Sequence, residues 1–118
     1  MKVFVIGPVR KATDTSRNEL EKHVAKLEAE GHVVHLPHRD TNQDATGLEI
    51  CKENAEAIAA ADEVHLFYLP ESLGSHFDLG VTFALKKRLR VIKNVPYGEG
   101  KSYPRMVDEW EKSLEVYE

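Results

Sequence analysis

The residues best suited to chemistry lie between Ser72 and Gly80, in the stretch SLGSHFDLG. Ser72, Gly74 and Ser75 are small, so their backbone N–H groups can approach an anion, and the two hydroxyls add further donors. Asp78 supplies a carboxylate that, in a cleft, can attack an electrophilic sugar carbon or stabilise positive charge on it. Structural roles are also open: Ser75 can cap a helix, Gly74 can permit a turn, and Asp78 can complement a helix dipole.

Two other polar segments could complete a binding site. The first follows an apolar run and reads GPVR, from Gly7 to Arg10. Arg10 can bind a phosphate or carboxylate through its fork-shaped guanidinium, or it can remain solvated beside Lys11. The second segment, residues 38–44, is dense in hydrogen-bonding side chains and suits recognition of a base or ribose, although loops are often polar without a binding role. Its candidate binding residues are His38, Arg39 and Asp40.

Short apolar runs alternate with helical patterns along the whole chain. Strands are predicted at residues 2–7, 32–37, 63–69 and 89–95, and helices at 13–30, 48–61, 76–87 and 103–116. Residues 38–47 and 70–75 are expected to be loops. This alternation predicts an α/β fold of residues 1–118 as a single domain, a flavodoxin-like three-layer sandwich with a four- to five-stranded parallel sheet.

The predicted topology brings the three polar segments together. Right-handed crossovers place the loops after the first three strands along one edge of the sheet. Ligands bind beyond the carboxyl ends of the strands in open sheets of this kind. The segments that contain Gly7, His38 and Ser72 are therefore expected to face one cleft.

Composition limits the classes of partner. The 118 residues carry a formal net charge of -4, which argues against nucleic-acid binding, and the basic run at residues 86–90 suits the end of a helix. The N-terminal apolar run is too short for a secretion signal or a membrane span, and no later apolar stretch approaches the length of a bilayer helix. A soluble, cytoplasmic protein is expected. The single cysteine, Cys51, is interpreted as a packing residue.

Metal and cofactor motifs are not found in the sequence. The spacing of the histidines does not match a metal site, and His35 and His65 are expected to be partly buried and hydrogen-bonded. The chain has no CxxC pair, no Walker loop and no GxGxxG after the first strand. We therefore predict neither a metal nor a cofactor.

Four segments together resemble a known family. They are the GPVR segment, the helix at residues 50–62, the strand entry at residues 61–64, and the SLGSHFDLG stretch. In this combination the chain resembles the nucleoside 2-deoxyribosyltransferase-like family, which includes deoxynucleoside monophosphate N-glycosidases. The last segment is similar to the family pattern Ser-x-Gly-x-x-aromatic-Glu-Leu-Gly. The resemblance implies a flavodoxin-like fold, a homo-oligomer (often a dimer), and cleavage or transfer at a nucleoside N-glycosidic bond.

The resemblance also implies roles for individual residues. Asp78 falls at the position of the nucleophilic glutamate, and Asn54 at that of an aspartate that orients or protonates the leaving group. Ser72 and Gly74 fall in the loop that holds the 5′ end of the substrate, and Arg10 matches an arginine near the phosphate. Two of these positions depart from the family. Asp78 is one methylene shorter than glutamate, and Asn54 lacks an acidic proton.

Three functions are compatible with these observations. The leading hypothesis is an N-glycosidase or deoxyribosyltransferase that acts on a nucleoside or nucleotide through Asp78. The alternative is a non-catalytic nucleotide-binding or sensor module on the same fold, which the two departures favour. A receiver-like signalling domain is disfavoured. It needs acidic residues after the first strand and an aspartate at the end of the third, where this chain has Gly7-Pro8 and Leu69-Pro70.

Overall fold

Four parallel strands form the centre of the molecule. The computed structural model describes residues 1–7 and 14–116 of the chain. The strands are β1 (Lys2–Ile6), β2 (Val33–His35), β3 (Glu63–Phe67) and β4 (Arg88–Lys93), in the order β2-β1-β3-β4. The helices are α1 (Asp14–Ala29), α2 (Pro37–Asp40), α3 (Gly47–Ala60), α4 (Leu73–Ala84) and α5 (Tyr103–Val116).

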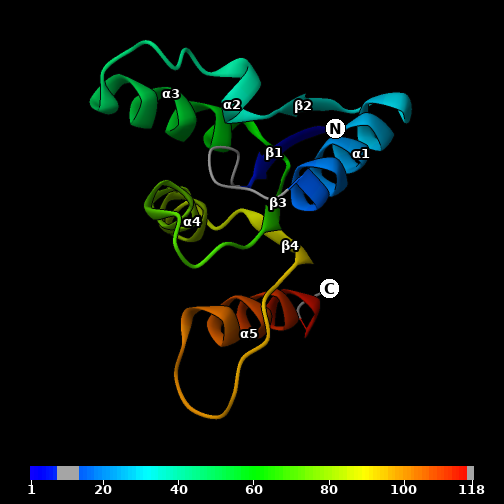
Figure 1. Ribbon diagram of the computed structural model, residues 1–118, viewed down its shortest axis with the longest axis vertical. Coiled ribbons are helices and arrows are strands. Elements are labelled where there is room, and N and C mark those ends of the chain that lie inside the picture. Colours follow the sequence, from blue (N-terminus) through cyan, green and yellow to red (C-terminus); the bar gives the residue numbers. More distant parts are fainter. Residues whose placement is uncertain (8–13, 117–118) are drawn as a thin grey trace.

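Helices cover both faces of the sheet (Figure 1). Successive side chains of a strand point to opposite faces, so β1 contributes to two separate cores. Val3 and Val5 pack with Leu20 and Val24 of α1, whereas Phe4 and Ile6 belong to the cluster that contains residues of α3, α4 and α5. The predicted α/β class, parallel sheet and three-layer, flavodoxin-like architecture are confirmed.

The start of α4 differs from the prediction. The helix begins at Leu73, three residues earlier than the expected start at residue 76. Ser72 is the N-cap, because its hydroxyl oxygen accepts a hydrogen bond from the backbone N–H of Ser75 at 3.2 Å. Asp78 therefore lies beyond the first turn of α4, outside the range in which a helix dipole stabilises a carboxylate.

A short helix, α2, was expected to be loop. The strand predicted at residues 32–37 ends at Pro37, because proline cannot continue a strand. Its fixed φ also suits the first position of a helix, and that role applies here. A carboxylate oxygen of Asp40 accepts a hydrogen bond from the N–H of Leu36 at 2.9 Å and closes the turn.

Among the described residues there is neither a membrane-spanning helix nor a cluster of metal-ligating side chains. None of the helices in residues 14–116 combines the length and apolar composition needed to cross a bilayer. Within the same described part of the chain, no three His, Cys, Asp or Glu side chains are grouped so that they could hold a metal ion.

Candidate functional site

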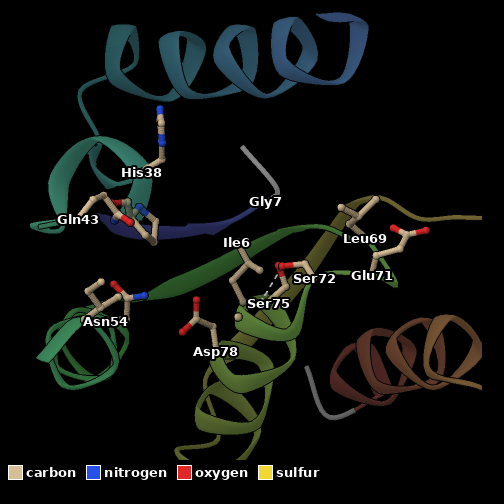
Figure 2. A pocket seen from close by; sticks show the side chains of 13 residues that line it. Ile6, Gly7, His38, Gln43, Asn54, Leu69, Glu71, Ser72, Ser75 and Asp78 are labelled. Carbon is tan, nitrogen blue, oxygen red and sulfur yellow. Dashed lines mark hydrogen bonds between the residues drawn. The ribbon is translucent and has the colours of Figure 1, made fainter. Parts of the chain in front are cut away.

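A pocket of about 340 Å³ opens at the carboxyl ends of β1 and β3. Three segments that are distant in sequence meet there: the end of β1, the α2 region, and the loop that leads into α4 (Figure 2). Side chains of α3 complete the wall. The lining residues are Ile6, Gly7, Pro37, His38, Gln43, Ile50, Asn54, Leu69, Glu71, Ser72, Gly74, Ser75 and Asp78.

Most of the candidate residues lie on this pocket. The structure brings together seven of them: Gly7, His38, Asn54, Ser72, Gly74, Ser75 and Asp78. Arg10 lies outside the described residues. At Gly7 the absence of a side chain matters for packing, because a Cβ there would overlap a methyl group of Leu20 in α1.

Asp78 is the only ionisable group among the described lining residues that is buried; its side chain is 6% exposed. Ser75 and Asp78 lie three residues apart on α4 and share the face of the helix that is turned inward. Burial raises the pKa of the Asp78 carboxyl to about 7, and a hydrogen bond with the Asn54 side chain opposes this increase. Ionised and neutral forms of Asp78 are thus both populated near neutral pH.

Asn54 reaches Asp78 from the opposite wall. It lies on α3, and Figure 2 shows its side chain and that of Asp78 extending into the space between the two helices. The hydroxyl of Thr41 donates a hydrogen bond to Oδ1 of Asn54 at 2.7 Å. This bond leaves the amide NH₂ group of Asn54 free to donate to the carboxylate.

The loop into α4 forms the polar floor of the pocket. The Ser72 hydroxyl accepts from the backbone of Ser75, so it is engaged as a helix cap. Gly74 has open space where a Cβ would lie. The first N–H groups of α4 have no partner within the helix, and the positive end of the helix dipole lies with them. This end of the pocket is suited to an anionic or hydroxyl group of a ligand.

Arg39 and Asp40 were expected to bind the ligand, and the structure does not bring them to the pocket. The Arg39 guanidinium donates to Glu28 at 3.1 Å, to the carbonyl of Val34 at 3.0 Å and to Asp40 at 2.9 Å. These bonds fasten α2 to α1 and β2. The two charged residues therefore hold the turn that presents His38 and Gln43 to the pocket.

Other lining residues were not singled out in the sequence analysis. Gln43 belongs to the polar run at residues 38–44, and its amide donates to the carbonyl of Pro37 at 2.7 Å. Ile50 precedes Asn54 by one helical turn, so helical periodicity could have identified it. Glu71 gave no signal beyond its place in the loop after β3. The expected hydrogen bonding of His35 and His65 is confirmed.

The fold and the pocket together define a class: a parallel α/β protein with a pocket at the carboxyl edge of its sheet, where proteins of this architecture bind ligands. No family model and no curated protein matches the sequence. Solved structures do match. A 2-deoxyribosyltransferase from Bacillus psychrosaccharolyticus has a TM-score of 0.67 at 19% identity, over 92% of this chain and 81% of that protein.

Two further solved structures share the fold. The Clostridium botulinum CMP N-glycosidase gives a TM-score of 0.64 at 20% identity, with 100% of both chains covered. A 2-deoxyribosyltransferase from Leishmania mexicana gives 0.59 at 25% identity, and 80% of this chain spans 65% of that longer protein. The matches support the resemblance to the nucleoside 2-deoxyribosyltransferase-like family, and the fold is that of its solved members.

Proposed function

We propose that this chain, folded as a single domain, cleaves or transfers the N-glycosidic bond of a nucleoside or nucleotide, with Asp78 as the nucleophile. The observation that carries the proposal is a buried carboxylate in a pocket at the carboxyl edge of the sheet, with a pKa of about 7. The fold shared with two deoxyribosyltransferases and a CMP N-glycosidase supports the choice of bond.

The reaction follows from the chemistry of the carboxylate. Ionised Asp78 attacks C1′ of the sugar, and the C1′–N bond breaks as a bond from C1′ to the carboxylate oxygen forms. The electron pair of the broken bond stays on the base, which takes up a proton from water. Water, or a second base, then attacks C1′ and releases Asp78. Because the ionised form attacks, activity should rise with pH through about 7.

The other pocket residues bind and orient the substrate in this proposal. The loop from Ser72 to Ser75 holds the 5′ end, and Arg10 binds a 5′-phosphate if one is present. His38 and Gln43 contact the base or the ribose, and Arg39 and Asp40 support them through α2. Asn54 orients the Asp78 carboxylate.

A homodimer is part of the proposal. Leu73 and Phe77 lie on α4 with 84% and 46% of their surfaces exposed, beside the residues that line the pocket. A second copy that packed on this face would remove the apolar surface from water and enclose the pocket mouth. Sedimentation velocity on the full chain measures the association.

The decisive test compares the wild-type chain with Asp78→Ala. Both are incubated with deoxynucleosides, ribonucleosides and their 5′-monophosphates, and released base is measured by chromatography. We expect release by the wild type to fall at least about 10³-fold in Asp78→Ala. Nucleotide binding, measured by calorimetry, should be retained. Asp44→Ala, which removes an exposed carboxylate from the 38–44 segment, is the matched control and should keep wild-type activity. Equal release by Asp78→Ala and the wild type would overturn the assignment.

A second candidate function is a nucleotide-binding or sensor module without turnover. It is favoured by Asn54, whose amide has no acidic proton to transfer to a leaving base, and by the short side chain of Asp78. The same experiment separates the two. Binding of a nucleotide by the wild type without release of base from any substrate supports the sensor.

A further inference from the structure

A chain of hydrogen bonds runs from β2 to Asn54, whose side chain faces Asp78 in the pocket (Figure 2). Nε2 of His35 lies 2.9 Å from the hydroxyl oxygen of Thr41, and that hydroxyl lies 2.7 Å from Oδ1 of Asn54. The side chain of Asn54 faces the Asp78 carboxyl, and its interaction with that group lowers the pKa of Asp78. The hydrogen-bond chain joins β2 to α3 through Thr41, and Asn54 and Asp78 both line the pocket.

The chemistry of the groups fixes the direction of these bonds. Oδ1 of Asn54 can only accept, so the Thr41 hydroxyl uses its single proton to donate to it. Nε2 of His35 must then carry the proton and donate to Thr41. With its Oδ1 occupied, Asn54 directs its NH₂ group to Asp78. Every donor in the chain therefore points toward the carboxylate.

The upstream members of this chain are held rigidly. The His35 ring stacks on Phe4, its partner in the β1–β2 register, with ring centres 5.4 Å apart and planes 7° from parallel. Thr41 is 3% exposed, and its backbone N–H donates to the carbonyl of Pro37 at 3.0 Å as the C-cap of α2.

We propose that Thr41 and His35 are positioning residues: they hold the Asn54 amide in the orientation that donates to Asp78 and so favour the ionised carboxylate. The effect of Thr41 and His35 on the ionisation of Asp78 does not depend on any reaction. Their effect on base release rests on the proposed function. Without the Thr41 hydroxyl, Asn54 can turn its carbonyl oxygen toward Asp78. A carbonyl accepts a hydrogen bond only from the protonated acid, so the neutral form would be favoured.

Few other titratable groups lie near Asp78 and His35 among the described residues. Among the described residues, burial and the Asn54 bond are what shift the pKa of Asp78, and the other titratable groups on the pocket are His38 of α2 and Glu71 before α4. Around His35 lie Asp40, Arg39 and, from α3, Glu53. Burial is the largest influence on His35 and lowers its pKa, so the ring is neutral at physiological pH and its Nε2–H tautomer can persist.

The test is a direct titration of the Asp78 carboxyl by ¹³C NMR in the wild type, Thr41→Val and Thr41→Ser, with Asp78→Asn used to assign the signal. Valine keeps the shape of threonine and removes the hydroxyl, whereas serine keeps the donor. We expect the midpoint to rise by about 0.5–1 pH unit in Thr41→Val and to return to the wild-type value in Thr41→Ser. An unchanged midpoint in a folded Thr41→Val overturns the proposal.

A second variant guards against misfolding of the first. His35→Phe keeps an aromatic ring to stack on Phe4 and removes the donor to Thr41. We expect a midpoint shift in the same direction, and no shift in a folded His35→Phe counts against the proposal.

Kinetics then separate this inference from the proposed function. In Thr41→Val the acidic limb of the pH profile of base release should move up by the same interval as the titration, with kcat reduced below neutral pH and KM little changed. If the wild type releases no base, the proposed function fails, and the NMR titration alone decides the roles of Thr41 and His35.

Discussion

Asp78→Asn should stabilise the protein at alkaline pH while it removes the nucleophile. Burial raises the pKa of Asp78 from its ordinary 3.8 to about 7. The folded state therefore holds the proton more tightly than the unfolded state, and the stability contributed by this group falls as pH rises from 3.8 toward 7. With about 1.4 kcal/mol for each pKa unit, the loss is about 2 kcal/mol at pH 5 and about 4 kcal/mol at pH 8.

The neutral amide of Asp78→Asn does not have this loss. It has nearly the shape of the protonated acid, so the two chains should differ least in acid. The free energy of unfolding of the variant minus that of the wild type should grow by about 2–3 kcal/mol between pH 5 and pH 8. Urea denaturation at both pH values, followed by the fluorescence of Trp110, measures this difference.

Asp44→Asn is the control, because it removes one exposed carboxylate that does not line the pocket. It reports the general effect of one fewer negative charge on a chain of net charge -4. A stability difference for Asp78→Asn that stays constant from pH 5 to pH 8, or that follows the control, would refute the conclusion that Asp78 is buried without adequate compensation.

Two further predictions concern the loop and helix that form the floor of the pocket. Asp78→Glu restores the methylene that the related family pattern contains. We expect kcat for base release, measured under saturating substrate, to rise about ten- to a hundredfold. A fall in kcat would show that the pocket accommodates the shorter acid better. Ser72→Ala removes the N-cap of α4, and we expect the free energy of unfolding, measured by urea denaturation, to fall by about 1 kcal/mol. Ser72→Asp, which keeps a capping oxygen, is the control. Equal stability of Ser72→Ala and the wild type would contradict the capping role.

The architecture followed from the sequence because each apolar run has one structural solution. The runs at residues 2–7 and 63–69 are short, rich in β-formers and followed by proline or glycine, and between them lie segments with helical periodicity. Such an alternation allows few topologies besides a parallel sheet with helices on both faces. The sheet order and the convergence of its carboxyl-edge loops follow from that constraint.

Local errors arose where one residue type has two uses. Proline ends a strand and also begins a helix, and at Pro37 the second use was missed. Ser72 and Ser75 can both cap a helix, and only the backbone decides that Ser72 does so. That difference of three residues changed the interpretation of Asp78, since it moved the carboxylate out of the first turn.

The partners of charged side chains could not be predicted from the sequence. The sequence around Arg39 is the same whether the guanidinium faces a ligand or Glu28. Which partner it binds depends on how α1 lies beside α2. The arrangement of His35, Thr41, Asn54 and Asp78 could not be predicted from the sequence either. These residues are separated by up to 43 positions, and only the fold brings them together. Sequence patterns identify groups that can react, but packing determines which of them meet.

The position of Asp78 is itself an argument for function. On the inward face of α4 its neighbours Leu79 and Thr82 are buried, and Thr82 satisfies its hydroxyl by donating to the backbone carbonyl of Asp78 at 2.7 Å. Packing at this position requires only a side chain of moderate size, and an amide would fill the space without the cost of a buried charge. Among the described residues, the compensation for the carboxylate is one amide, held in place by Thr41. A carboxylate that lowers stability at neutral pH, and that faces an amide held in place by Thr41, is better explained by the proposed reaction than by the stability of the fold.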